Sequence, residues 1–349
     1  MKKSTLTYQE IYAQPESFKG INDSLDSLYK VLDRVFNTGK VYDELLFTGC
    51  GTSFYLAQSA AHSFSSYTGT PAKAVPCSEL FFFPETYIKG KNVLVLPITR
   101  KSYTTEVRMA IDKVRSFPNV KTLAITCDKD SEIYNDDVLL SPETKEDSVI
   151  MTRSFTSMVY LSVVMAMYVG GKKDEIEAMS QYDRIARELL VQMDDLTKRI
   201  IDENPELNLF ITLGQGVYYG IANECMNKMK EMGIVNSEAY YSLEYRHGPM
   251  SLVDRNTLVL SLINSKTLEY DAKLLSQMKC YGAVTVAVGE KVDALVGDAD
   301  YKLDLGYGLN DIQYAPVIGI IGQLLGYYIA EKKNINADSP RNLSQAIVL

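Results

Sequence analysis

Apolar and polar positions follow two rhythms along the chain. Apolar runs of three to seven residues alternate with stretches in which apolar residues recur every three or four positions. The first rhythm is typical of buried strands, and the second of helices with one buried face. Strands that alternate with helices predict an α/β fold with parallel sheets. In the first half the runs are Leu45–Phe47, Val93–Ile98, Val120–Thr126 and Val138–Leu140, with helices expected near 54–67 and 105–117.

The N-terminal segment and the middle of the chain predict helices only. Between Thr7 and Tyr42 the apolar residues are spaced as one buried helical face requires. They are Ile11, Phe18, Ile21, Leu25, Leu28, Leu32 and Val35. Two more helical stretches are expected at about 152–169 and 174–204. The second of them interleaves acidic and basic residues. We interpret them as a connector between two halves.

The second half of the chain repeats the first. Four landmarks recur in the same order, at offsets of 163 to 165 residues. Gly49-Cys50-Gly51 corresponds to Gly214-Gln215-Gly216, Asn92–Leu96 to Asn256–Leu260, Thr122–Thr126 to Thr285–Gly289, and Asp137–Leu140 to Asp300–Leu303. A constant offset predicts a duplicated α/β unit. We therefore expect a helical segment (1–40), a first domain (41–175), a second domain (195–335) and a tail (336–349).

The first apolar run ends in the turn Gly49-Cys50-Gly51-Thr52-Ser53. Glycine lets the backbone approach a bound group closely, and Thr52 and Ser53 stand where a helix N-cap is expected. Backbone amides at a helix start attract a phosphate. An ordinary strand-to-helix turn would show the same pattern. The repeat carries Val217 and Tyr218 in place of the hydroxyls, so a phosphate site belongs to the first copy.

A second polar turn, Thr99-Arg100-Lys101-Ser102-Tyr103-Thr104, follows the run Val93–Ile98. Parallel strands deliver their carboxyl ends to one edge of the sheet, where ligands of open α/β sheets bind. Hydroxyls and cations there suit a phosphate, although a solvated polar loop is the alternative. The residues predicted to bind phosphate are Gly51, Thr52, Ser53, Thr99, Arg100, Lys101, Ser102 and Thr104.

The second copy holds the densest group of charged residues. Glu224, Lys228 and Glu231 are spaced to share one helical face, which usually means a surface ion-pair ladder. Methionines lie on the other side of the same helix, so the charged stripe can instead line a cleft. His247 follows in a turn before Gly248-Pro249 and can titrate near neutral pH. The other histidine, His62, is expected to be a structural or surface residue.

Composition limits the class of partner. The net charge of −8 argues against nucleic acid and anionic membranes as main partners. Five scattered cysteines without a CxxC pair predict reduced thiols, and Cys50 is expected to be a small packing residue. The Met1-Lys2-Lys3 start lacks an apolar signal core, and Ala315–Ala330 is shorter than a spanning helix. We expect a soluble cytoplasmic protein without a metal site or cofactor.

These motifs resemble a known family. The turn at 49–53, the turn at 99–106 and Met151-Thr152-Arg153-Ser154-Phe155-Thr156 resemble the first sugar isomerase (SIS) domain of phosphosugar isomerases. Residues 224–231 and 237–249 resemble the second. The opening Glu10–Pro15 and the tail Ser339–Leu343 are similar to the isomerase half of glucosamine-6-phosphate synthase. The resemblance covers nearly the whole chain.

The resemblance implies a fold and a mechanism. The fold would be two tandem flavodoxin-like domains with three αβα layers, in a homodimer that binds a sugar 6-phosphate. Glu231 would be the base that moves a proton between C1 and C2 of the sugar. His247 would act in ring opening, reaching the site from the neighbouring subunit, and Lys228 would support substrate binding. A proton transfer of this kind needs one carboxylate over both carbons and an anchored phosphate.

Three departures from the family pattern narrow the function. The chain starts without the synthase's glutamine-hydrolysing domain, so synthesis from glutamine is not expected. Lys101 and Ser102 replace a hydroxyl residue and a glycine of the phosphate turn, and Gln345 replaces a lysine that forms an imine. We therefore expect an isomerase that is also an amino-sugar-phosphate deaminase. The alternatives are a fructosamine-6-phosphate deglycase and a non-catalytic phosphosugar-binding regulator.

Overall fold

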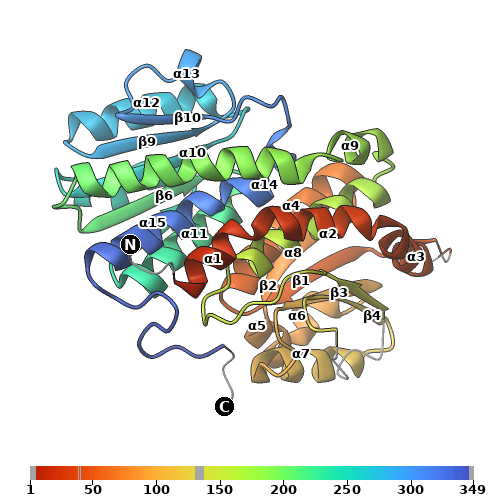
Figure 1. The fold of residues 1–349 in the computed structure, drawn as a ribbon. Coiled ribbons are helices and arrows are strands. Elements are labelled where there is room, and N and C mark those ends of the chain that lie inside the picture. Colours follow the sequence, from red (N-terminus) through yellow and green to blue (C-terminus); the bar gives the residue numbers. More distant parts are fainter. Residues whose placement is uncertain (1–4, 38, 40, 130–136, 346–349) are drawn as a thin grey trace. The chain divides into compact units, whose positions relative to one another are not determined.

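A computed structural model describes residues 5–37, 39, 41–129 and 137–345 (Figure 1). The chain forms two compact units, each built from segments that are separated in sequence. The N-unit comprises Ala13–Asp147, Arg153–Asp183 and Ser344–Leu349. The C-unit comprises Met1–Tyr12, Ser148–Thr152 and Arg184–Leu343. The helical N-terminal segment is thus divided between the two units at Tyr12, while the expected domain ranges followed chain order.

The N-unit contains a parallel sheet of five strands in the order β2-β1-β3-β4-β5. The strands are β1 (Glu44–Gly49), β2 (Ala72–Pro76), β3 (Val93–Thr99), β4 (Val120–Thr126) and β5 (Asp137–Leu140). Strands β1 and β3 are buried along their whole length because helices cover both faces of the sheet. Since β1 and β3 are neighbours, the two polar turns lie at adjacent strand ends, as predicted.

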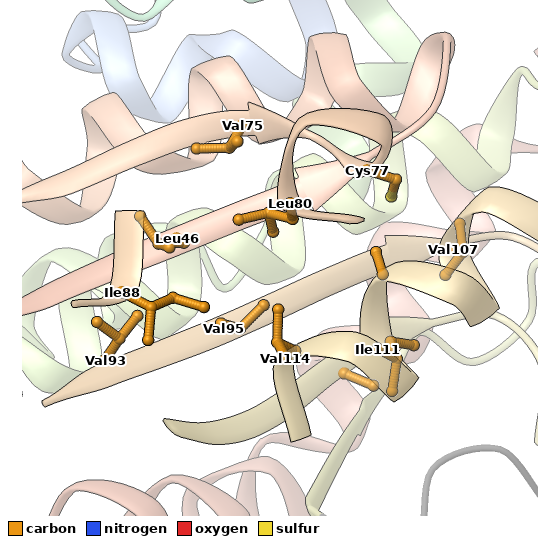
Figure 2. Close-up of a cluster of buried hydrophobic side chains, with 12 residues drawn as sticks. Leu46, Val75, Cys77, Leu80, Ile88, Val93, Val95, Val107, Ile111 and Val114 are labelled. Atoms are coloured by element: carbon orange, nitrogen blue, oxygen red, sulfur yellow. The ribbon is translucent and has the colours of Figure 1, made fainter. Parts of the chain in front are cut away.

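Helices cover both faces of this sheet, in three layers. One face packs against α4, with α8 behind it, and the other packs against α5, α6 and α7. Figure 2 shows the apolar cluster on the second face, from Val93 and Ile88 at one end to Cys77 and Ile111 at the other. The helices of the N-unit are α2 (Gln14–Asp23), α3 (Leu25–Phe36), α4 (Thr52–Thr68), α5 (Cys77–Phe82), α6 (Pro84–Ile88), α7 (Thr105–Arg115), α8 (Arg153–Val169) and α9 (Lys173–Ala178).

The C-unit repeats this arrangement and confirms the duplication. Its sheet has the order β7-β6-β8-β9-β10, which matches β2-β1-β3-β4-β5 strand for strand. The strands are β6 (Leu209–Gly214), β7 (Asn236–Tyr240), β8 (Thr257–Ile263), β9 (Val284–Gly289) and β10 (Tyr301–Asp304). When the five strands of each sheet are numbered within their own repeat, both sheets have the order 2-1-3-4-5. This is the strand order of flavodoxin-like folds, so the expected fold class is confirmed.

Helix α11 packs on one face of the second sheet with α15 behind it, and α12 and α13 lie on the other face. The helices of the C-unit are α1 (Leu6–Tyr12), most of α10 (Tyr182–Glu203), α11 (Tyr218–Gly233), α12 (Leu268–Cys280), α13 (Val292–Leu295), α14 (Asp311–Ile318) and α15 (Ile320–Lys332). Helix α1 joins this unit through Tyr8 and Tyr12, whose hydroxyls both donate to Asp194 on α10.

Some expected elements differ from those observed. Strands β2 and β7 were not predicted, because each has only one fully buried residue and so lacks an apolar run. The helix expected at 174–204 is interrupted between α9 and α10. The expected apolar face at the N-terminus is buried except at Leu25, which is partly exposed.

The apolar stretch near the C-terminus is longer than the sequence suggested. The span Asp311–Lys332, which comprises α14 and α15, is 22 residues long, and by length and composition alone it could cross a membrane. However, 94% of its most apolar window is buried inside the structure. Burial of this degree is typical of a core helix, and the close approach of glycines to α11 described below accounts for it.

Candidate functional site

The glycine turn after β1 has the tight backbone that the sequence predicted. Gly51 has a φ of 53°, a left-handed conformation that favours glycine. A β-carbon on Gly49 would lie 2.7 Å from the carbonyl carbon of Ser53, so the helix start packs directly on the strand end. Helix α4 begins at Thr52 with Gly51 as its N-cap. Thr52 and Ser53 therefore lie in the first helical turn, and their expected N-cap position was wrong.

These two hydroxyl residues are largely enclosed by the fold. Thr52 is 6% exposed and Ser53 is 5% exposed. The Ser53 amide donates to the carbonyl of Cys50, and the Phe54 amide donates to the carbonyl of Gly51. Two amides of the first turn are thus used within the turn itself. An anion at this edge would meet the start of α4, where the helix dipole favours negative charge.

The turn after β3 is held by its own polar side chains. The hydroxyl of Thr99 donates to the carbonyl of Lys101 at 2.6 Å. Both the amide and the hydroxyl of Ser102 donate to the carboxylate of Asp128, at 3.1 and 2.5 Å. Thr104 caps α7 in extended conformation. Thr99 and Ser102 therefore fix the shape of the loop, a role that the sequence did not predict for them.

Arg100 is also engaged with the protein. Its guanidinium Nη1 lies 2.9 Å from Oε2 of Glu146, and both side chains are buried. Its Nη2 donates to the backbone carbonyl of Gln345 at 3.0 Å. The same Glu146 accepts from the amide and the hydroxyl of Ser154 at the start of α8. This network ties the loop to two distant segments of the N-unit.

A pocket of 560 Å³ lies beside this loop, at the carboxyl ends of β3, β4 and β5. Arg100, Lys101, Lys129 and Arg153 line it together with Asp128 and other residues. Gln345 lines it too, and its side-chain amide donates to the carbonyl of Asp147. The pocket thus brings Lys101 together with Gln345, two positions where the chain departs from the family pattern.

The charged residues of α11 form a buried group in the C-unit. Nζ of Lys228 lies 3.1 Å from Oε1 of Glu224 and 2.5 Å from Oε2 of Glu231. The side chains of Glu224 and Lys228 are 0% and 1% exposed, whereas that of Glu231 is 23% exposed. The usual reading of this spacing, a surface ladder, is therefore wrong. Only Glu231 extends from the buried pair toward solvent.

Two opposing effects act on the charge of Lys228. Burial alone would lower the pKa of its ammonium group, but the flanking Glu224 and Glu231 outweigh burial and raise the pKa. Lys228 is thus protonated at neutral pH and cannot serve as a base. Its ammonium instead fixes the rotamer of Glu231 through a charge-assisted hydrogen bond.

Glycines on α15 allow this helix to press against α11. A β-carbon on Gly322 would meet the backbone of Cys225 at 2.5 Å, and one on Gly326 would meet the carbonyl oxygen of Lys228 at 2.6 Å. The close packing expected at these glycines is confirmed. The packing of α15 against α11 encloses Lys228. Glu231, three residues further along α11, lies at the edge of the packed surface.

His247 lies in an exposed turn of the C-unit. It follows the short 3-10 helix Glu244–Arg246, and its amide donates to the carbonyl of Glu244 at 3.0 Å. Gly248 has a φ of 120°, which turns the chain into a second 3-10 helix, Pro249–Leu252. The described contacts join Lys228 to Glu231 and do not include a contact of His247 with either residue.

Two residues that hold the loop at 99–104 were missed in the sequence, Asp128 and Glu146. Asp128 stands two residues after β4, so the rule that located the two polar turns could have found it. Glu146 lies within an evenly polar stretch and carries no local signal.

Comparison with known proteins agrees with the duplicated architecture. The family model for the SIS domain matches residues 42–169 and residues 208–330, one match in each repeat. Among curated proteins, glutamine–fructose-6-phosphate aminotransferase (isomerizing) of Sulfurisphaera tokodaii is 29% identical over 348 residues. That alignment covers 98% of this chain and 56% of the relative. The chain therefore spans little more than half the length of this relative.

Solved structures show the same fold. Glucosamine-6-phosphate deaminase of Thermotoga maritima has a TM-score of 0.79 and 27% identity, covering 99% of this chain and 100% of that one. Tagatose-6-phosphate ketose/aldose isomerase of Escherichia coli has a TM-score of 0.86, covering 99% of this chain and 96% of that one. Its identity is 22%, so this second likeness concerns the fold alone.

Proposed function

Because the chain belongs to the SIS domain family, we propose that it is a phosphosugar aldose-ketose isomerase that deaminates hexosamine 6-phosphates. The observation that carries the proposal is the contact between Lys228 and Glu231 on α11. A carboxylate held in one rotamer at the rim of a buried ion pair suits a base that must reach two adjacent carbons. The likeness to glucosamine-6-phosphate deaminase supports the choice of an amino sugar.

The proposed reaction begins with opening of the sugar ring. His247 of the partner subunit donates a proton to the ring oxygen in a homodimer. Glu231 then takes the proton from C2 of the open aldose and returns it to C1, which converts the amino carbon C2 into an imine. Water adds to this imine, ammonia leaves, and the ketose 6-phosphate remains. One carboxylate performs both proton transfers, so Glu231 returns to its starting state.

The proposed phosphate anchor lies in the N-unit. The start of α4, with Thr52 and Ser53, supplies the helix dipole and hydroxyls, and Gly51 allows close approach. The turn at 99–104 adds Lys101, while Thr99, Arg100 and Ser102 keep the loop in shape. Gln345 cannot form an imine with a ketose, so ammonia release through water fits the residues present.

A panel of substrates tests this proposal. The purified protein is incubated with glucosamine 6-phosphate, galactosamine 6-phosphate and fructoselysine 6-phosphate, and ammonia, lysine and ketose phosphate are measured. We expect ammonia and ketose 6-phosphate in equal amounts from one of the two hexosamine 6-phosphates. Release of lysine would favour the deglycase instead. Tight binding of a phosphosugar without any turnover would overturn the enzymatic proposal in favour of a regulator.

A further inference from the structure

Two cysteines lie side by side at the edge of the N-unit sheet that carries the glycine turn. Strands β1 and β2 are paired in parallel, with Gly49 opposite Pro76 at their ends. Cys50 directly follows β1, and Cys77 directly follows β2. Neighbouring strands are about 4.8 Å apart, and disulfide-bonded cysteines have α-carbons about 4.4 to 6.8 Å apart. The register therefore places this pair within reach of a disulfide, although both thiols are reduced in the structure.

The two thiols are close enough to shift each other's pKa, with Cys50 acting as the donor toward the sulfur of Cys77. The hydroxyl of Thr48 donates to the same sulfur at 3.4 Å. Cys77 is buried within the apolar cluster drawn in Figure 2, and Cys50 packs against that cluster while remaining partly exposed. The contact thus joins an accessible thiol to a buried one.

The two thiols differ in their chemistry as well as in their exposure. The hydrogen bond from Cys50 lowers the pKa of the Cys77 thiol, against the opposing effect of burial. The same hydrogen bond, together with burial and the nearby carboxylate of Glu106, raises the pKa of Cys50. Cys77 is consequently the better thiolate of the reduced pair, whereas Cys50, the accessible thiol, must first lose its proton before it can attack a disulfide.

We propose that Cys50 and Cys77 form a redox modification site that closes to a disulfide on exposure to a low-molecular-weight disulfide. In the first step the sulfur of Cys50 attacks the small disulfide, forms a mixed disulfide and releases one small thiol. In the second step the Cys77 thiolate attacks the sulfur of Cys50 and expels the other small thiol. Two protein thiols are oxidised and one small disulfide is reduced to two thiols, so atoms and electrons balance.

The bond would act on the proposed phosphate anchor. Cys50 stands between Gly49 and Gly51, so a disulfide ties the centre of the turn to the start of α5. The equivalent turn of the C-unit has Gln215 in the place of Cys50, so it cannot form this bond. Oxidation therefore changes one copy of the repeat only. This consequence rests on the proposed function, whereas the disulfide itself does not.

Peptide mapping after oxidation tests the site directly. The folded protein is treated with oxidised glutathione, blocked with a maleimide under denaturing conditions and digested with trypsin. Cleavage after Lys73 places Cys50 and Cys77 in separate peptides, so a cross-linked peptide identifies the bond. We expect this peptide, and the loss of two of the five thiols. Maleimide labelling of Cys50 and Cys77 as complete as in untreated protein would overturn the proposal.

Two variants separate the pair from general thiol reactivity. In Cys77→Ser, we expect glutathione to remain attached to Cys50 because no second thiol expels it. In Cys280→Ser, which removes an exposed cysteine of the C-unit, we expect the Cys50–Cys77 peptide at its wild-type yield. Cross-linking of Cys50 to any other cysteine in Cys77→Ser would contradict the specific pairing. Circular dichroism of each variant shows whether the fold is retained.

An activity assay then tests the consequence for the anchor. If the proposed function holds, oxidation is expected to raise the KM for the phosphosugar several-fold, with recovery after dithiothreitol. Cys50→Ser, which can form neither the mixed disulfide nor the cross-link, should have the same KM before and after this treatment. A wild-type KM in protein that mapping shows to be fully cross-linked would contradict the effect on the anchor. Absence of any phosphosugar turnover would count against the proposed function and leave the mapping result intact.

Discussion

The turns after β1 and β6 have the same backbone and different side chains. Gly51 and Gly216 both adopt positive φ, at 53° and 61°. A β-carbon on Gly49 would collide with the backbone of Ser53, and one on Gly214 would collide with that of Tyr218, at the same offset of 165 residues. The repeat has preserved the turn as an element of the fold. The glycines alone therefore do not identify a binding site.

The helices that follow the turns differ in a complementary way. At the same offset, Glu224, Lys228 and Glu231 of α11 correspond to three serines of α4, Ser59, Ser63 and Ser66. Conversely, Thr52 and Ser53 correspond to Val217 and Tyr218, which are both 1% exposed. One copy thus has hydroxyls at the helix start, and the other has charges along the helix. This difference is the basis of the proposed division of roles, with the phosphate anchor in the first copy and proton transfer in the second.

The largest expected effect on stability comes from the buried charges of α11. Lys228→Met leaves the carboxylate of Glu224 buried without its cation, so we expect the free energy of unfolding to fall by about 3–5 kcal/mol. The equivalent Ser63 is also buried, and its hydroxyl donates to the carbonyl of Ser59. Ser63→Ala should cost about 1 kcal/mol or less.

Urea unfolding followed by circular dichroism measures both variants. A loss in Lys228→Met no greater than that in Ser63→Ala would show that the ion pair contributes little, and the contrast between the two helices would then be one of sequence only.

Next in size is the effect of the hydroxyls on substrate binding. Ser53→Ala removes a group proposed to contact the phosphate, so we expect the KM for the phosphosugar to rise about 10-fold, since a hydrogen bond to a charged group contributes about 1.5 kcal/mol or more. Tyr218→Phe changes the equivalent residue of the C-unit and should leave KM unchanged. Steady-state kinetics measures the KM of both variants. Equal KM values would contradict a phosphate anchor that lies in the N-unit alone.

A smaller contrast lies at the opposite ends of the same strands. At the start of β1, Oε1 of Glu44 lies 2.6 Å from Nζ of Lys73, and Oε2 lies 2.5 Å from Nζ of Lys91. The equivalent position of β6 is Leu209, which has no charge. Burial acts to raise the pKa of Glu44, but the two lysines outweigh it and lower the pKa below its ordinary value of 4.5. A carboxyl with a lowered pKa stabilises the fold above its unfolded-state pKa and loses this contribution as pH falls through its folded-state pKa.

Glu44→Gln should therefore reduce the free energy of unfolding by about 1 kcal/mol at pH 7, because exposed lysines are screened by solvent. The difference from wild type should shrink as pH falls below about 5. Glu85→Gln, at an exposed position of the N-unit, is the matched control. A difference that stays constant down to pH 3 would mean that packing, not charge, accounts for the loss.

Periodicity and the internal repeat predicted a duplicated α/β fold, and the family resemblance implied its flavodoxin-like domains. Apolar runs located β1, β3, β4 and β5 in the first half, and the repeat located β8, β9 and β10 in the second. Central strands such as β1 and β3 show these runs because they are buried on both faces of the sheet. Strands β2 and β7 were not predicted because most of their residues are partly or fully exposed, so they contain no apolar run. The family resemblance supplied the roles proposed for the site residues.

The contacts of the site were harder to predict than its location. No local pattern pairs Arg100 with Glu146, 46 residues away, or places Cys77 beside Cys50. Burial of Glu224 and Lys228 depends on glycines of α15 almost 100 residues further along the chain. Charge spacing on a helix is the same for a surface ladder and for a buried pair, so only the packing of a second helix distinguishes them.

The division of roles between the copies is tested most directly by Glu231→Gln, assayed for turnover and for binding of a phosphosugar by calorimetry. We expect kcat to fall by about 10²- to 10⁴-fold, the range for loss of a general base, while the Kd stays within about threefold of wild type. Glu206→Gln, an exposed carboxylate of the C-unit, should change neither. Wild-type turnover in Glu231→Gln would contradict the assignment of the base to the second copy.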